Sequence, residues 1–275
     1  MPDKGINIIK DINGLKYVQF KNLLKYEGQL VHCFTTRIGG VSSGECATLN
    51  LGFNRNDSRE NVLENYRRVC NALDIDMESL VFSNQVHDKR IKIVDENDRG
   101  KGITRESDII GYDALATNCK NVALVTFYAD CVPVLLYDSG KGAIASVHSG
   151  WRGTVKKIAA NAVRKMAEAY GCNPGKIEAV IGPSIGRCCF EVGEEVYREF
   201  VENIEYSADC CVKTGIRKWN VDLQEIIKKT LIYSGLKENN IYLSEICTKC
   251  NKDMFFSHRG DNGKTGSLAA IMMLK

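Results

Sequence analysis

The sequence predicts an α+β protein built as a layered α/β sandwich with mixed sheets. Short apolar runs rich in β-branched residues alternate irregularly with segments of helical periodicity, a pattern that favours helices covering some faces of the sheets. With 275 residues and 44% hydrophobic content, the chain is long enough to bury a full core and lies near the upper size of one domain. We therefore expect a single domain over residues 1–275.

Helical periodicity occurs in four segments, namely residues 58–75, 154–171, 191–202 and 222–234. At the start of the first, Asp57 and Glu60 have the spacing of a capping box. The second ends at Gly171, because glycine readily adopts the left-handed conformation found at helix ends. In the last segment, Asp222 suits the helix start and Gly235 the stop.

Strands are predicted where short apolar, β-rich runs occur, at residues 30–36, 90–95, 121–127, 132–138, 143–148, 176–182, 241–247 and 267–274. Three glycine-rich segments separate them and should form loops: residues 39–44, 95–108 and 257–266. Binding residues tend to lie on such loops.

Charge and hydropathy argue against large polyanionic or lipid partners. The net charge is +3 and no block of like charge occurs, so we expect neither nucleic-acid nor membrane binding. The N-terminus lacks a signal-peptide pattern, and no run approaches the roughly 18 apolar residues of a membrane span. We expect a cytoplasmic protein, and the sequence leaves its oligomeric state open.

The twelve cysteines are expected to be reduced thiols, since the chain is too long to need disulfides and has no export signal. Cys247 and Cys250 form a CxxC pair, but a closed zinc site needs two more ligands. The adjacent pair Cys188–Cys189 lacks chelating spacing, as does Cys210–Cys211. The spacing therefore does not predict a structural zinc site.

The segment ADCVPVLLYD (129–138) places Cys131 directly before an apolar strand. Two apolar runs around a short Gly- and Asp-containing turn predict a β-hairpin. A loop over 138–141 puts Cys131 opposite His148, and a five-residue loop shifts the partner of His148 to Val132. In either register Cys131 and His148 lie at the same end of the hairpin, and Cβ atoms of opposed residues are about 5 Å apart. That separation suits a shared metal ion or a thiol–imidazole pair, whereas simple packing is the alternative for a buried thiol.

His87 is the natural third member of this group, although an exposed loop imidazole is the alternative interpretation. The chain has four histidines, and His87 lies in a polar stretch where packing does not need it. One cysteine and two histidines leave the fourth tetrahedral position of zinc free, which is the catalytic arrangement. Asp130 or Asp88 is expected to orient an imidazole or to handle a proton.

Anion contacts are expected near SGWRGT, which links the His148 strand to the following helix. Backbone N–H groups in the first turn of that helix, together with Arg152, are candidates to receive phosphate. The alternative is a tight turn that needs glycine, with Arg152 solvated. Arg37, before GGVSSG, and Asn50, in ATLNLG, are further candidate substrate contacts.

Several motifs occur together and in one order: TTRIGGVSSG, ATLNLG, NQVH, DALAT, ADCVPVLLYD, SVHSGWRGT, IGPSIGRCCFEVG and FFSHRGDNGKTG. Over residues 30–272 the chain resembles the laccase-domain family, also described as polyphenol oxidase-like, as multifunctional purine nucleoside phosphorylases, and in bacteria as the peptidoglycan editing factor. The resemblance implies a single-domain layered fold related to cysteine-hydrolase toxins. It also implies a zinc ion bound by His87, Cys131 and His148.

The resemblance implies phosphorolysis of purine nucleosides (adenosine, inosine, guanosine and methylthioadenosine) and deamination of adenosine, with phosphate as the second substrate. Cys131 and His148 would be catalytic, and Asp130 is our candidate for proton transfer. One alternative is a hydrolase of a cell-wall precursor, with Cys131 as nucleophile and His148 as base. A non-catalytic binding protein is another.

The name laccase fits the residue count poorly. The chain has four histidines and no His-x-His pair, so it cannot be an ordinary multicopper oxidase, although one bound copper with weak oxidase activity remains an alternative. Two positions also depart from the family pattern: Gly260 and Ser267 stand where relatives often carry arginine. Substrate contacts of those arginines do not transfer to this chain.

Overall fold

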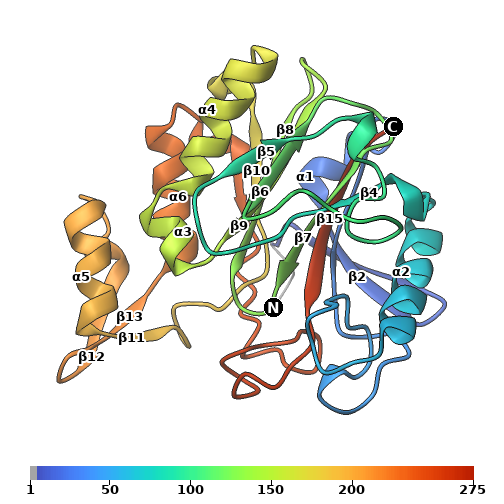
Figure 1. Cartoon of the computed structure of the whole chain (residues 1–275). Coiled ribbons are helices and arrows are strands. Elements are labelled where there is room, and N and C mark those ends of the chain that lie inside the picture. Colours follow the sequence, from blue (N-terminus) through green and yellow to red (C-terminus); the bar gives the residue numbers. More distant parts are fainter. Residues whose placement is uncertain (1–4) are drawn as a thin grey trace.

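Two mixed six-stranded sheets packed face to face form the centre of the computed structural model, which describes residues 5–275 (Figure 1). In hydrogen-bonded order, the first contains β1 (Asn7–Ile12), β2 (Leu15–Phe20), β3 (Leu30–Thr35), β15 (Leu268–Leu274), β7 (Ala123–Tyr128) and β4 (Leu80–Phe82). The second contains β14 (Ile241–Leu243), β10 (Glu178–Ile181), β8 (Val132–Asp138), β9 (Ala143–Ser149), β6 (Ala114–Thr117) and β5 (Ile91–Ile93). Both sheets are mixed because β4–β7, β5–β6 and β10–β14 pair in parallel and the other neighbours pair antiparallel.

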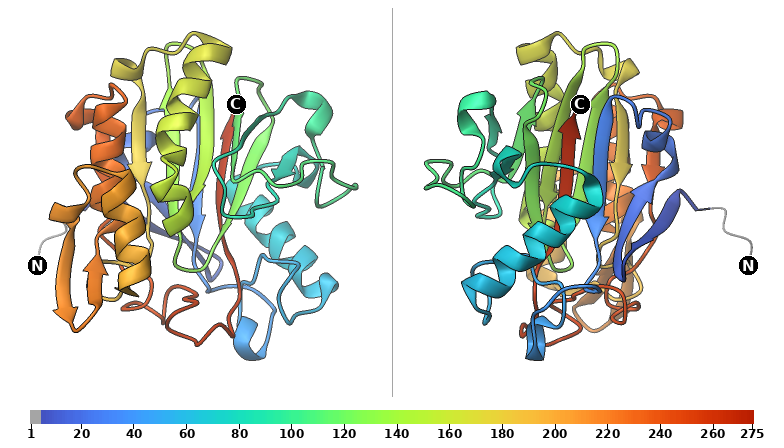
Figure 2. Two further views of the ribbon diagram at one scale, coloured as in Figure 1. Left: turned by 60° about the vertical axis from the view of Figure 1, so that its left-hand side comes forward. Right: turned by 90° about the vertical axis from the view of Figure 1, so that its right-hand side faces the viewer.

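Helices cover the outer faces of both sheets, so the molecule has four layers (Figure 2). Helix α2 (Arg59–Leu73) packs on the first sheet, and helices α4 (Ile158–Tyr170) and α6 (Leu223–Tyr233) pack on the second. The residues between the sheets form a third apolar cluster. Successive residues of β7 show the alternation of a strand buried on both faces, since Leu124 points between the sheets and Val125 towards α2. The predicted layered α+β class is confirmed.

A small three-stranded sheet lies at one side of the molecule (Figure 1) and contains β11 (Glu191–Gly193), β13 (Lys218–Val221) and β12 (Cys211–Gly215). Helix α5 (Glu194–Asn203) packs on it through Tyr197, whose ring stacks on Trp219 at 4.4 Å. The remaining short elements are α1 (Lys21–Leu24), α3 (Trp151–Val155) and the 3₁₀ turns at Gly44–Cys46, Met77–Ser79, Glu96–Asp98, Pro174–Lys176, Ala208–Cys210 and Glu238–Asn240.

The helix predicted over 154–171 is interrupted. Lys157 adopts a left-handed conformation with φ of 55°, which separates α3 from α4. The apolar pattern runs through the break, so periodicity alone does not reveal it. Helix α2 begins after Ser58, whose hydroxyl accepts the N–H of Asn61, rather than at the predicted Asp57 cap.

Other differences concern short elements. The first three residues of the helix predicted over 191–202 form β11. Strands β1, β2, β4, β6, β12 and β13 were not predicted, because they are short or carry polar residues that blur the two-residue alternation. Within residues 5–275, no helix is both long and apolar enough to cross a membrane.

The hairpin β8–β9 forms as predicted, but its register differs from both expected registers. His148 pairs with Pro133, and the turn contains residues 139–142. The register shifts because Asp138 continues the ladder opposite Ala143, while its carboxylate accepts the N–H groups of Gly140 and Lys141. Cys131 therefore lies one residue before β8, still at the same end of the hairpin as His148.

We predict that Ser58→Ala lowers the free energy of unfolding by about 1 kcal/mol, because the first turn of α2 loses its side-chain acceptor. Ser58→Asp is the matched control and should retain most of the stability, since a carboxylate can accept the same N–H. Urea denaturation followed by circular dichroism measures both variants. Equal unfolding midpoints for the wild type and Ser58→Ala would refute the assigned cap.

Candidate metal centre and its cavity

Three side chains from separate segments converge at one end of the central hairpin. His87 lies in the loop after β4, Cys131 in the loop between β7 and β8, and His148 near the end of β9. Their potential ligand atoms all lie within 4.8 Å of one another. Cys131 Sγ is 3.9 Å from His87 Nε2, and sulfur and nitrogen ligands on one tetrahedral zinc ion are separated by about 3.6 Å. The donor set and its spacing thus fit a single zinc ion.

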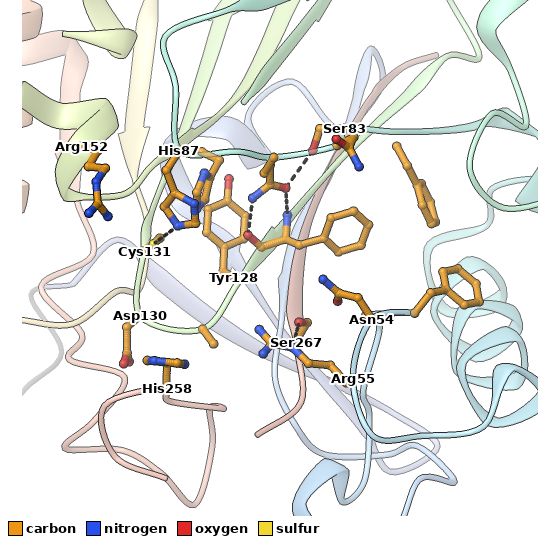
Figure 3. Close-up of a pocket in the computed structure, with 18 of the residues that line it drawn as sticks. Asn54, Arg55, Ser83, His87, Tyr128, Asp130, Cys131, Arg152, His258 and Ser267 are labelled. Atoms are coloured by element: carbon orange, nitrogen blue, oxygen red, sulfur yellow. Dashed lines mark hydrogen bonds between the residues drawn. The ribbon is translucent and has the colours of Figure 1, made fainter. Parts of the chain in front are cut away.

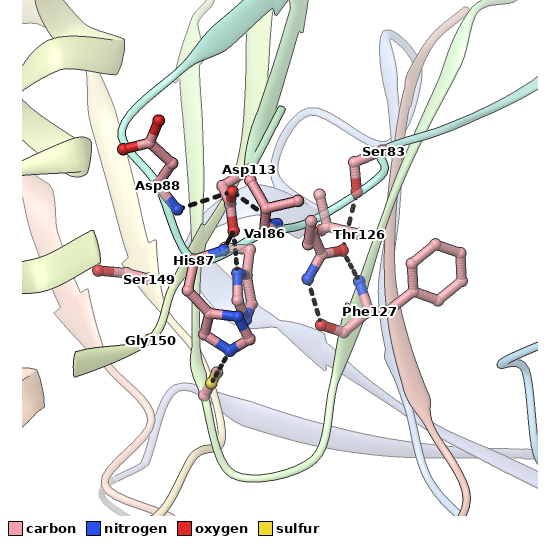
Figure 4. Close-up of polar contacts among 12 residues, drawn as sticks. Ser83, Val86, His87, Asp88, Asp113, Thr126, Phe127, Ser149 and Gly150 are labelled. Carbon is pink, nitrogen blue, oxygen red and sulfur yellow. Dashed lines mark hydrogen bonds and ion pairs between the residues drawn. The ribbon is translucent and has the colours of Figure 1, made fainter. Parts of the chain in front are cut away.

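Asp113, directly before β6, organises this group (Figure 4). One carboxylate oxygen is 2.8 Å from His148 Nδ1, which leaves Nε2 of that ring for Cys131 and a metal. The same carboxylate accepts the backbone N–H groups of Val86, His87 and Asp88 at 2.9–3.0 Å. A single buried side chain therefore positions both imidazole-bearing segments.

The sequence interpretation assigned the orienting carboxylate to Asp130 or Asp88, and the structure replaces both with Asp113. Asp88 turns away and forms an ion pair with Lys156 at 2.8 Å. A signal for Asp113 was present, since it begins the DALAT motif. What was missing was the pairing of β6 with β9, which sets Asp113 beside His148.

Cys131, His148 and Asp113 are electrostatically coupled. Burial alone would raise the pKa of the Cys131 thiol, but His148 and His87 lower it to about 6. Burial would lower the pKa of His148, but Cys131 and Asp113 raise it to about 9. The pKa of Asp113 falls despite burial, because His148 and backbone N–H groups donate to its carboxylate. In the absence of metal, a thiolate–imidazolium pair is the favoured state of Cys131 and His148.

Gly150 follows β9 and passes close to the cluster. A Cβ atom at this position would lie 2.9 Å from His87 Cδ2 and 3.0 Å from Cys131 Sγ. The first contact is closer than packed Cβ atoms show and the second is at that limit, so a larger residue would push on both ligands. The site thus requires glycine at position 150, the first glycine of SGWRGT. The expected anion-binding turn is short, since α3 contains only Trp151–Val155.

The cluster borders a cavity of about 740 Å³, a size that suits a small-molecule ligand (Figure 3). His87, Cys131 and Arg152 lie on one side, while Asn54, Arg55 and Ser267 lie towards the other. The remaining wall includes an aromatic group, Phe53, Phe82 and Phe127, in which Phe82 and Phe127 meet edge to face at 5.2 Å. The cavity therefore combines aromatic and cationic surfaces.

Arg55 is a cavity residue that the sequence interpretation missed. Its Nε donates to the hydroxyl of Ser267 at 2.8 Å. Ser267 is one of the two positions that depart from the family pattern, and in this chain it positions Arg55. Burial lowers the pKa of Arg55 below its usual value, but the guanidinium remains cationic because its reference pKa is so high. The sequence carried no separate signal for Arg55 beyond its closeness to ATLNLG.

Arg152 is the one expected substrate contact that lines the cavity. Arg37 and Asn50 are not among the described residues that line it. Arg37 donates to the carbonyl oxygens of Ala47 and Lys252, both at 3.0 Å. Asn50 is fully buried, and its amide oxygen accepts the N–H of Ser267. Both residues brace loops around the cavity.

Asp130 lines the cavity, but its carboxylate already accepts two hydrogen bonds. Thr248 Oγ1 donates to Oδ1 at 2.7 Å, and the N–H of Arg259 donates to Oδ2 at 2.6 Å. Asp130 also has a positive φ of 83°. These bonds fix the loop that presents Cys131, so the geometry favours a positioning role for Asp130 over proton transfer.

The other two histidines lie in different surroundings. His32 is buried in β3, where its Nε2 accepts the N–H of Phe20 at 2.9 Å, and burial lowers its pKa to about 4. His258 lines the cavity, as expected for its glycine-rich loop. The described chain therefore brings two of its histidines, His87 and His148, to the thiol.

Fold and site together define an α+β protein with a Cys–His–His ligand set at the end of a central hairpin. Residues 31–275 match the family described as multi-copper polyphenol oxidoreductase laccase, and the chain belongs to this family. The crystal structure of YfiH from Bacillus licheniformis, described as a hypothetical protein, is 31% identical, covers 97% of this chain and 99% of its own, and superimposes with a TM-score of 0.91.

Curated relatives carry enzyme names. Purine nucleoside phosphorylase YlmD of Bacillus subtilis (strain 168) is 37% identical over 90% of this chain and 89% of the relative. A purine nucleoside phosphorylase of Bacteroides thetaiotaomicron is 34% identical over 98% of this chain and 99% of the relative. Adenosine deaminase RL5, from an unknown prokaryotic organism, is 34% identical over 83% of this chain and 88% of the relative.

We predict that Asp113→Asn weakens zinc binding by about 10–100-fold, because His148 loses the carboxylate that orients it. Asp88→Asn is the control and should bind zinc like the wild type, since its side chain faces Lys156. Competition with a chromophoric chelator measures both affinities. An unchanged affinity in Asp113→Asn would contradict the assigned role.

A second prediction concerns Gly150. Gly150→Ala should lower zinc affinity by about 10-fold or more, because the added methyl group displaces His87 and Cys131. Gly140→Ala, in the exposed hairpin turn, is the matched control, since its new Cβ would have Asp138 Oδ1 at 3.4 Å as its nearest neighbour. Isothermal titration with zinc tests the pair, and equal affinities in the two variants would show that the backbone adjusts.

Proposed function

We propose that this protein is a zinc-dependent purine nucleoside phosphorylase that acts on adenosine, inosine, guanosine and methylthioadenosine and also deaminates adenosine. The observation that carries the proposal is the His87, Cys131 and His148 set on the wall of a cavity with aromatic and cationic sides. The enzyme names of the relatives support the substrate class.

Zinc would be held by the two imidazoles and the thiolate, with Asp113 fixing the ring of His148. A bound zinc ion supplies Lewis acidity at the cavity wall. Copper competes for the same nitrogen and sulfur ligands, so a copper-loaded form with weak oxidase activity is an alternative to zinc in the same site.

The rest of the cavity binds and orients the substrates. The aromatic group of Phe53, Phe82 and Phe127 offers a surface on which a purine can stack. Arg55 and Arg152 offer charge for phosphate. In phosphorolysis a phosphate oxygen bonds to the anomeric carbon while the glycosidic bond breaks, and the purine leaves with the bonding electrons and takes up the proton that the phosphate loses. Holding both reactants in line accounts for much of the expected rate enhancement.

A second candidate function is supported by one specific observation. Cys131, His148 and Asp113 stand in the order of a nucleophile, a base and an orienting carboxylate, and the pKa of the thiol is lowered to about 6. That order is typical of cysteine hydrolases. Such a site would cleave an acyl or amide bond of a cell-wall precursor without metal.

Phosphate-dependent release of base from a panel of purine nucleosides tests the proposal. The wild type should release base only with phosphate present, and lose the activity on chelation and regain it with zinc. His148→Ala should lose more than about 100-fold in rate, because it removes a ligand outright. Cys119→Ser, which changes a half-buried thiol outside the cavity, is the control.

The outcomes separate the two functions. An unchanged rate of base release in the absence of phosphate and after chelation would overturn the phosphorylase proposal. Cleavage of a muropeptide by the metal-free protein, abolished in Cys131→Ala, would establish the hydrolase instead.

Replacing Arg55 and Arg152 singly by alanine should raise the KM for phosphate more than the KM for nucleoside.

A further inference from the structure

A second group of cysteines lies outside the cavity described above. Cys188, Cys189, Cys247 and Cys250 come from two loops, and their sulfur atoms all lie within 4.8 Å of one another. The spacing of these residues along the chain did not predict the group, because two of its members are adjacent and the CxxC pair lies about sixty residues further on. Folding supplies the second pair of ligands that the CxxC pair lacked.

We propose that these four cysteines form a structural site for one zinc ion, distinct from the Cys–His–His centre. Four thiolates complete a tetrahedral shell and leave no position for substrate. The class of metal follows from the ligands, since four sulfur donors in a tetrahedral arrangement select zinc or iron over magnesium, calcium or manganese.

The distances match such a shell. Cys250 Sγ is 3.6 Å from Cys188 Sγ and 3.5 Å from Cys189 Sγ. Sulfur atoms bound to one zinc ion at about 2.3 Å are separated by about 3.8 Å. A small adjustment of the side chains therefore brings all four sulfur atoms to ligand distance.

The backbone at Gly186 lies close to two of the proposed ligands. The N–H of Gly186 donates to Cys247 Sγ at 3.2 Å, a contact that stabilises a thiolate. A Cβ atom on Gly186 would lie 3.1 Å from Cys247 Cβ and 3.3 Å from Cys188 Sγ. Glycine thus allows the backbone to approach two of the proposed ligands at once.

Packing and disulfide formation explain the group less well. Cys188 and Cys250 are exposed, so core packing does not account for them. Cys250 is almost equidistant from Cys188 and Cys189, whereas a disulfide would join it to one of them at about 2.05 Å and leave the other unpaired. A shared cation uses all four sulfur atoms.

The site would join the two loops that hold Asp130. Ser184 and Cys247 form a β-bridge, the N–H of Ile185 donates to the carbonyl oxygen of Asp130 at 2.9 Å, and Thr248 donates to the Asp130 carboxylate. Asp130 directly precedes Cys131. A zinc ion bound to the four cysteines would therefore hold together the two loops that fix Asp130, and with it the position of Cys131.

Metal stoichiometry of the full chain tests the proposal. Protein purified under reducing conditions without a metal-affinity step is assayed by elemental mass spectrometry. We expect two zinc ions per wild-type chain and one in the double variant Cys188→Ser/Cys250→Ser, whose exposed positions should tolerate serine. His87→Ala should also retain one, and Cys119→Ser should retain two.

Cobalt substitution identifies the ligands independently of activity. In His87→Ala, cobalt should show the intense sulfur-to-metal charge transfer of a four-thiolate site, and this absorption should vanish when Cys188→Ser/Cys250→Ser is added. One zinc in the wild type that only the cysteine variant loses would support this site while opposing the proposed function.

Three results would overturn the inference. The first is an unchanged zinc content in Cys188→Ser/Cys250→Ser. The second is iron in place of zinc. The third is a disulfide between Cys250 and Cys188 or Cys189, detected by intact mass after alkylation without reductant.

Discussion

The carboxylate of Asp113 is the contact on which the candidate metal centre depends. It accepts a hydrogen bond from His148 and from three consecutive backbone N–H groups that include His87. Its fully buried position makes these charge-assisted bonds stronger than they would be in water. Because β6 pairs with β9, one side chain orients two imidazoles that are far apart in the sequence.

A second carboxylate performs a comparable role for the thiol. Asp130 is bound by Thr248 and by the backbone of Arg259, so the loop that presents Cys131 is tied to two segments near the C-terminus. The four-cysteine group lies in the same region, with Cys247 adjacent to Thr248. The proposed catalytic site and the proposed structural zinc site therefore depend on the same loops but share no ligands.

The sequence predicted those parts of the structure that depend on local pattern. The apolar runs of β8 and β9 and the turn between them predicted the hairpin, and hence the proximity of Cys131 and His148. The register required knowledge of the turn, because Asp138 both pairs with Ala143 and accepts two turn N–H groups. Arg37 and Asn50 were predicted as binding residues because they are polar and lie in or beside loops. In the structure they form hydrogen bonds that hold those loops in place, since a polar side chain in a loop can serve either purpose.

By itself, the sequence determined the layered α+β class and the hairpin, because periodicity and turn chemistry act over a few residues. It predicted His87 as the partner of Cys131 and His148 from the polar stretch around it and from the family motifs. Only the tertiary structure decided which carboxylate orients His148, that Arg55 rather than Arg37 reaches the cavity, and that four cysteines from two loops meet. Those contacts join segments tens of residues apart, and their geometry is set by the order of strands in the sheets and by the loops packed at their ends.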